Sequence, residues 1–116
     1  QPDANPLKLF LASLEHYARL PEETLVLPSH GLPFVGARER VAQLRTHHEQ
    51  RLAELFEACS TPRSAHDVLG VLFRRKLDNH QLLFAMGESM AHLHYLYQEN
   101  RLRRDKTESV VRYQQR

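Results

Sequence analysis

The sequence predicts a mainly α-helical protein, a small bundle of helices that ends in a short β-hairpin. Two long stretches, residues 37–58 and 80–99, repeat apolar side chains at helical spacing. The third observation is a pair of strand-like segments near the C-terminus, separated by a turn-prone stretch. The chain has 116 residues, of which 41% are hydrophobic and 26% are charged. This size and composition are those of a single globular domain with a modest core.

A first helix is predicted from residue 6 onward. Asn5 is a good N-cap, and Pro6 suits the first helical position because its missing N–H would have no partner there. The helix should end by Leu20, because Pro21 disfavours its continuation. Apolar residues at i, i+3, i+4, i+7 and i+11 fall on one face of this helix: Leu7, Phe10, Leu11, Leu14 and Ala18.

A short apolar run follows at residues 24–27, and its branched side chains suit a buried strand. Pro28 would end this strand because it cannot donate to a ladder, and Gly31 allows a sharp turn. The turn places His30 in a loop at the mouth of the strand, where an imidazole can bind a metal or transfer a proton. Taken alone, a loop histidine that faces water is the commoner explanation.

The second helix is predicted over about Ala37 to Ala58. Arg45 and Glu49 on its outer face are spaced to form an ion pair. His47 and His48 are adjacent, so their side chains point about 100° apart and cannot easily bind one ion. We favour one histidine in a helix interface and the other in solvent. The inner stripe consists of Val41, Leu44, His48, Leu52, Leu55 and Phe56.

A shorter helix should follow a break at residues 60–63. Ser64 and Asp67 resemble a capping box, and the apolar stripe runs from Ala65 to Phe73. Three cations at residues 74–76 are the best candidates in the chain for contact with DNA phosphates. Cations at a helix C-terminus are common without any ligand, so we favour a role in stabilising the helix end.

The last helix, about residues 80–99 with Asp78 or Asn79 as its cap, should be the central one of the bundle. Met86 and Met90 are expected to fill the core, and Gly87 to permit a close helix crossing. Its apolar face is predicted to comprise Leu82, Leu83, Met86, Met90, Leu93 and Tyr97, extended by Phe84, Ala91 and Leu96.

The histidines of this helix do not suggest a metal site. His92 and His94 are two positions apart and face nearly opposite sides, so they form a poor chelate. The spacing of His80, Glu88 and His92 does not complete a zinc site either.

Asn100 is a natural left-handed stop for this helix, and residues 102–104 and 110–113 should then form a hairpin. Three helices followed by such a wing give a bundle of winged-helix type, a shape that does not by itself define a function.

Charge and cysteine content set further limits. The net charge is +2, and residues 101–116 carry six basic and two acidic side chains, so the remainder is −2. This basic tail could contact an anionic partner, but a solvated hairpin is the explanation we favour. Cys59 is the single cysteine and is expected to be a small core residue, compatible with a cytoplasmic location. No apolar run approaches the roughly 20 residues that span a bilayer, so we expect no membrane association.

The order of these segments resembles the end of a metallo-β-lactamase-fold hydrolase. In that superfamily a helix with a Ser-Leu pair, here Ser13-Leu14, leads into the last strand. A Pro-Ser-His-Gly loop, here residues 28–31, then supplies the final metal-binding histidine. The helical extension of one branch is similar to the rest of the chain, notably to residues 47–52 and 91–96 and to the basic tail.

The resemblance implies two regions. Residues 1–35 would be the last helix and strand of the αββα core, and residues 36–116 a winged-helix-like helical domain. His30 would be a metal ligand in the intact parent, whose cofactor would be zinc or another divalent metal. The helix that carries His47 and His48 would border the active-site cleft.

The superfamily signature His-x-His-x-Asp-His does not occur in this chain. The chain starts at Gln1, so we expect the C-terminal part of a larger enzyme, with no catalytic residue and no metal of its own. The missing sheet should leave the apolar face of residues 7–18 and the edge of residues 25–27 exposed, packed differently or covered by a second copy.

Three functions follow from these observations. The first is part of a metal-dependent hydrolase of small-molecule esters or thioesters, or of phosphodiesters, in which this region shapes the substrate cleft or a dimer interface. One histidine cannot supply the three protein ligands of a typical catalytic zinc, so this part alone should be inactive. The second is a winged-helix DNA-binding module, and the third is a protein-interaction or homodimerisation module.

Nucleic acid is the least favoured partner. A recognition helix needs exposed basic or amide side chains that reach base edges. The helix over residues 80–99 contains no Lys or Arg, and it exposes Glu88 and Glu99, which would repel phosphate.

Overall fold

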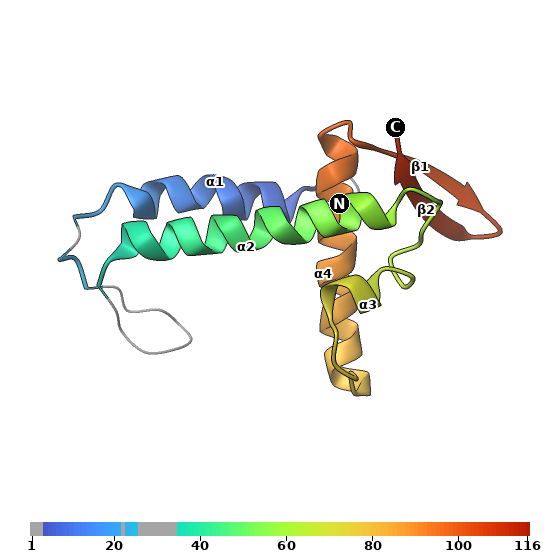
Figure 1. Ribbon diagram of the computed structural model, residues 1–116, viewed down its shortest axis with the longest axis horizontal. Helices are drawn as coiled ribbons and strands as arrows, with labels where there is room; N and C mark the ends of the chain where they lie inside the picture. The colour runs from blue at the N-terminus through green and yellow to red at the C-terminus, as the bar shows by residue number, and fades with distance from the viewer. Residues whose placement is uncertain (1–3, 22, 26–34) are drawn as a thin grey trace.

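The computed structural model describes residues 4–21, 23–25 and 35–116. Helices α1 (Pro6–Ala18) and α2 (Ala37–Ala58) lie side by side and antiparallel, and α4 (Asn79–Gln98) crosses them (Figure 1). The one-turn helix α3 (Leu69–Leu72) packs on α2 and α4. Strands β1 (Leu102–Thr107) and β2 (Val110–Gln115) form the C-terminal hairpin beside the C-terminal ends of α2 and α4. The prediction of a mainly helical chain with a final hairpin is therefore confirmed.

Helix α1 begins and ends as its sequence predicts. The Asn5 side chain accepts a hydrogen bond of 3.2 Å from the Lys8 backbone N–H, and Pro6 occupies the first turn. Leu7 and Leu14 are buried because α1 packs on α2 and α4. Two residues of the predicted apolar face are thus buried within the chain, whereas Phe10 on the same face is 42% exposed, so this face is left partly open.

The strand expected at residues 24–27 is not found in its described part. Thr24 and Leu25 have no strand structure, and the Thr24 backbone N–H closes a turn onto the Pro21 carbonyl at 3.0 Å. Residues 26 and 27 lie outside the described residues. A lone strand has no neighbour to satisfy its backbone groups, which is a physical reason for the turn.

Helix α2 has the bounds that the sequence predicts. Arg45, however, pairs with Glu15 of α1 rather than with Glu49 of its own helix. The antiparallel packing of α1 brings Glu15 within reach, so a tertiary ion pair replaces the local one.

At the C-terminal end of α2, Cys59 is fully buried as expected, and burial raises the pKa of its thiol to about 11.

The short third helix is shorter still than predicted. Residues 65–68 form turns, and only Leu69–Leu72 is helical. The reciprocal bonds of the capping box are present: Ser64 N–H donates to Asp67 Oδ2 at 3.0 Å, and Asp67 N–H donates to Ser64 Oγ at 3.1 Å. The bond from the Ser64 N–H is the main reason why the pKa of Asp67 is lowered.

Helix α4 starts at a full capping box between Asp78 and Gln81, but its buried face differs from the predicted one. The buried residues are Ala85, Ser89, His92, Leu93 and Leu96. Leu83, Phe84 and Met90 are exposed, the first two by 73% and 67%. The expected close crossing at Gly87 is also wrong, because an added Cβ there would have no described atom within 4 Å.

The hairpin is longer than predicted. Thr107 pairs with Val110, so Glu108 and Ser109 alone form the turn, both with positive φ. Asn100 is left-handed as expected, and the bonds Arg101 N–H to Leu96 O and Asn100 N–H to Tyr97 O form a Schellman motif.

The hairpin closes one end of the core. Backbone hydrogen bonds join Tyr113 to Arg63 in both directions, and Gln115 N–H to the Cys59 carbonyl. The hairpin is thereby tied to the loop after α2. The most deeply buried apolar side chains come from α2, the loop before α3, α4 and β1: Leu55, Cys59, Val68, Leu93, Leu96 and Leu102.

Candidate functional site

The histidine singled out by the sequence, His30, lies outside the described residues. Its role as a metal ligand therefore stays a prediction, as does the boundary between residues 35 and 36. In the ranges 4–21, 23–25 and 35–116, no group of three or more His, Cys, Asp or Glu side chains could hold a metal ion. The described residues alone thus do not assemble a metal centre.

Two histidines that are far apart in the sequence, on different helices, are in contact in the structure. His48 of α2 stacks on His92 of α4, with ring centroids 5.5 Å apart. Phe10 of α1 meets the His48 ring edge-on at 5.5 Å, and His47 does so at 5.7 Å. The prediction that His48 faces a helix interface while His47 faces solvent is confirmed. The partner His92 was missed, because spacing rules compare residues within one helix only.

Burial lowers the pKa of both stacked histidines, which favours their neutral form. Burial is the first cause of the lowered pKa of His92, which is 1% exposed, and also of the lowered pKa of His48. The charge of His92 lowers the pKa of His48 further. A neutral, buried imidazole pair can exchange a proton with solvent only through its more accessible member, His48.

The other histidines of α4 lie apart from this pair. His80 contacts Phe84 edge-on at 5.3 Å on the exposed side of the helix. His94 lies beside Tyr97, and its Nε2 is buried with no hydrogen-bond partner among the described residues. His92 and His94 thus have different neighbours, because His92 stacks on His48 and His94 lies beside Tyr97.

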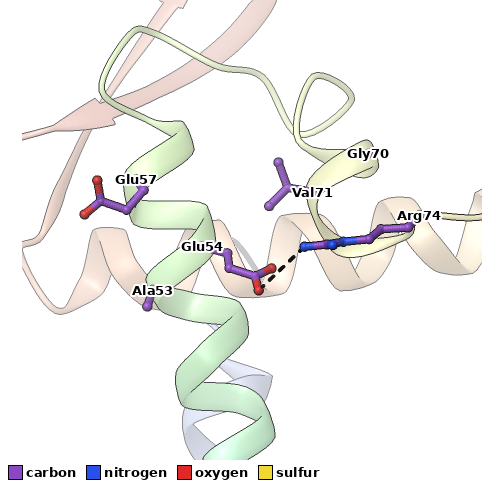
Figure 2. Close-up of a pocket in the computed structure, with 6 residues that line it drawn as sticks. All are labelled: Ala53, Glu54, Glu57, Gly70, Val71 and Arg74. Atoms are coloured by element: carbon purple, nitrogen blue, oxygen red, sulfur yellow. Dashed lines mark ion pairs between the residues drawn. The ribbon is translucent and has the colours of Figure 1, made fainter.

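A groove of about 540 Å³ lies between α2 and the α3 region (Figure 2). Glu54 faces Arg74 across it, with 3.9 Å between carboxylate and guanidinium, and Val71 lines its wall. Glu57 points away from this ion pair (Figure 2). The expected role of residues 74–76 in stabilising the helix end is wrong, because α3 ends at Leu72 and has no basic residue in its last turn. Arg74 instead pairs with a carboxylate of α2.

Some basic side chains of the C-terminal tail form contacts within the domain. The Arg101 guanidinium lies over the Phe56 ring at 4.4 Å, and that of Arg104 lies over the Tyr97 ring at 4.1 Å. Cation–π contacts of this kind stabilise the junction between hairpin and helices. They also hold two of the six basic side chains of the tail against the protein.

The exposed apolar side chains of α1 and α4 are a further feature. Leu9, Leu83, Phe84 and Met90 are each more than half exposed. Leu83 and Phe84 are adjacent in the sequence of α4, whereas Leu9 belongs to α1. In the described part of the chain, no helix is both long enough and apolar enough to cross a membrane.

Comparison with known protein families shows the class to which this chain, with its packed helices and closing hairpin, belongs. The family model for the metallo-beta-lactamase-like C-terminal domain matches residues 52–116, which is more than half of the chain. The chain therefore belongs to this family.

Two solved structures are similar over almost the whole chain. A beta-lactamase domain protein from Burkholderia ambifaria is 48% identical, with a TM-score of 0.96 over 100% of this chain. A metallo-beta-lactamase family protein from Thermus thermophilus is 34% identical, with a TM-score of 0.80 over 97% of this chain. The chain spans 35% and 34% of the length of these two proteins. No curated protein matches it.

Proposed function

We propose that this chain acts as the C-terminal part of a metal-dependent hydrolase of the metallo-β-lactamase superfamily. The observation that carries the proposal is the match of all 116 residues, at 48% identity, to about a third of a beta-lactamase domain protein. The substrates would be esters, thioesters or phosphodiesters, and the cofactor zinc or another divalent metal. His30 would supply one metal ligand, and the described residues would supply none.

The part played by the described residues would be structural. Their arrangement, three principal helices followed by a hairpin, supports a domain of winged-helix type. Leu83 and Phe84 of α4 and Leu9 of α1 present apolar surface that a larger catalytic part could cover. In this role the domain would form one wall of the substrate cleft, and alone it would be inactive.

The test compares this chain with the protein encoded by its whole reading frame. The longer protein should bind a divalent metal and hydrolyse at least one of three probes: p-nitrophenyl acetate, an acyl-coenzyme A thioester and bis-p-nitrophenyl phosphate. His30→Ala should lower its metal content and reduce turnover by at least about 100-fold, whereas the exposed His66→Ala should leave both unchanged. Unaltered metal content and turnover in His30→Ala would refute the ligand role.

Homodimerisation is a second candidate, supported by the same exposed side chains of α1 and α4. It predicts a concentration-dependent sedimentation coefficient for the 116-residue chain, and Phe84→Lys should abolish that dependence. A strict monomer at millimolar concentration would contradict it. Nucleic acid remains the least favoured partner, because two arginines of the hairpin already stack on aromatic rings of the domain.

A further inference from the structure

One aromatic contact site joins three helices. His48 of α2, His92 of α4 and Phe10 of α1 meet where α1 and α2 cross α4 (Figure 1). His92 is 1% exposed, whereas His48 and Phe10 are partly open to solvent. The two imidazoles therefore form a polar contact between α2 and α4.

The hydrogen bonds determine where the protons of this pair lie. His92 Nδ1 is 2.7 Å from the Glu88 carbonyl oxygen, which can only accept, so Nδ1 carries the proton. In neutral His92 the other nitrogen, Nε2, is then an acceptor, and its neighbour at 3.4 Å is His48 Nδ1. A hydrogen bond between the two rings therefore requires His48 to donate from Nδ1. In that arrangement His48 Nε2 is the one nitrogen of the pair that can take up a proton without breaking this chain of bonds.

We propose that the His48–His92 pair is an acid-sensitive latch, which holds α1 and α2 against α4 while both rings are neutral and loosens this junction when they are protonated. The closed pair accepts at most one proton, because a proton on His92 Nε2 would set two N–H groups against each other. Once the helices separate, each ring accepts one. Acid therefore favours the open junction, since the state that binds more protons gains population as the pH falls.

The charged groups around the pair act on the pKa of the two rings in both directions. On α2, Arg51 and His47 disfavour protonation of both rings, and Arg51 is fixed by donating from Nε to His47 Nε2 at 3.0 Å. On α4, Glu88 raises the pKa of His92, first through the hydrogen bond to its backbone carbonyl and then through its carboxylate, 3.9 Å from His92 Nδ1. For His92 each of these two effects exceeds that of Arg51 or His47. From α1 the contacting group is the uncharged Phe10 ring. Burial remains the largest cause of the lowered pKa of both rings.

The lowered pKa of the two rings determines the direction and the size of the pH effect on this helix junction. Because each folded pKa lies below the unfolded value of about 6.5, the stabilisation is complete above that pH and is lost as the pH falls below it. Each ring that is neutral when closed and charged when open should raise the open-to-closed ratio about tenfold between pH 7.5 and 5.5. This inference concerns helix packing and is independent of the proposed hydrolase role.

Nuclear magnetic resonance on the 116-residue chain tests the latch. At pH 7.5, imidazole nitrogen spectra should show a proton on Nδ1 of both rings, and both should titrate below pH 6.5. Amide exchange at residues 7–14 of α1 should become at least about tenfold less protected at pH 5.5, after correction for the intrinsic exchange rate. A titration of His48 and His92 at or above pH 6.5 would overturn the proposal, as would protection that does not change with pH.

The matched variants are His48→Asn and His66→Asn. An asparagine amide nitrogen lies close to the position of Nδ1 and can donate, but it does not titrate, so His48→Asn should weaken the pH dependence of α1 protection about tenfold. His66 is exposed, and its replacement should leave the dependence as in the unmodified chain. Equal pH dependence in His48→Asn and the unmodified chain would contradict the proposal. If His48→Asn does not fold, the titration of the unmodified chain decides.

Discussion

The hydroxyl of Ser89 in α4 donates a hydrogen bond of 2.7 Å to the backbone carbonyl of Ala65. Ser89 is fully buried, and Ala65 lies in the loop that leads to α3. This bond fixes the half-buried Ala65 and its loop to the central helix. A small hydroxyl thus performs a task in the core that a larger apolar side chain could not.

Replacing this hydroxyl tests its contribution. Ser89→Ala should lower the free energy of unfolding by about 0.5–1.5 kcal/mol, because the half-buried Ala65 carbonyl would lose the hydroxyl as its partner. Urea denaturation measures the change, and Ser13→Ala on the less buried side of α1 is a suitable control. A loss below about 0.5 kcal/mol would show that water replaces the hydroxyl at no cost.

Gly87 offers a stabilising substitution. It lies within α4, and an added methyl group would meet no described atom within 4 Å. Gly87→Ala should therefore raise the free energy of unfolding by about 0.8–1 kcal/mol through helix propensity alone. Gly36→Ala is the contrasting variant, because φ there is +81° and an alanine would be strained. The midpoint temperature of thermal unfolding should rise for Gly87→Ala and fall for Gly36→Ala. A destabilised Gly87→Ala would indicate a contact at this face.

Asn100 ends α4 in the left-handed conformation, with φ of 62°. Asn100→Ala should cost about 1–2 kcal/mol, because a Cβ without a polar side chain is disfavoured there. Asn100→Gly should be neutral or slightly stabilising, since glycine adopts this conformation freely. The denaturant concentrations at the midpoint of unfolding are compared between the two variants. Equal effects of alanine and glycine would mean that the side chain, rather than the backbone, matters at this position.

The hairpin turn combines two residues that are poorly suited to it. Glu108 and Ser109 have φ of 52° and 66°, the pattern of a type I′ turn, for which Asn-Gly is preferred. The double variant Glu108→Asn with Ser109→Gly should stabilise the chain by about 1 kcal/mol. The gain should appear as slower amide exchange across the ladder between β1 and β2. Unchanged exchange would show that the hairpin opens only when the whole domain unfolds.

Much of the local structure follows from neighbouring residues. Asn5 with Pro6, Asp78 and Asn100 set the ends of their helices through bonds that span at most five residues. The bounds of α2 follow from its periodicity in the same way. Family membership was also available from the residue pattern, because it depends on the order of motifs rather than on packing.

Tertiary structure decided which face of α4 is buried and which residues α2 contacts. By hydrophobicity alone, Leu83 and Met90 belong inside and Ser89 and His92 outside, yet the reverse is found. The crossing of α1 and α2 supplies His48 as a partner for His92, and the loop before α3 supplies the Ala65 carbonyl for Ser89. A buried polar group is stable only when a partner is present, and sequence spacing within one helix does not reveal a partner on another.

The same reason explains Arg45, which forms its ion pair with Glu15 on α1 instead of Glu49 one turn away. Local pairs on a helix surface contribute only about 0.2–0.5 kcal/mol, so the packing of a neighbouring helix easily redirects them. The sequence by itself thus determined where the helices and the hairpin lie along the chain. Only the packing of α1 and α2 across α4 decided which polar side chains are buried, and with which partners.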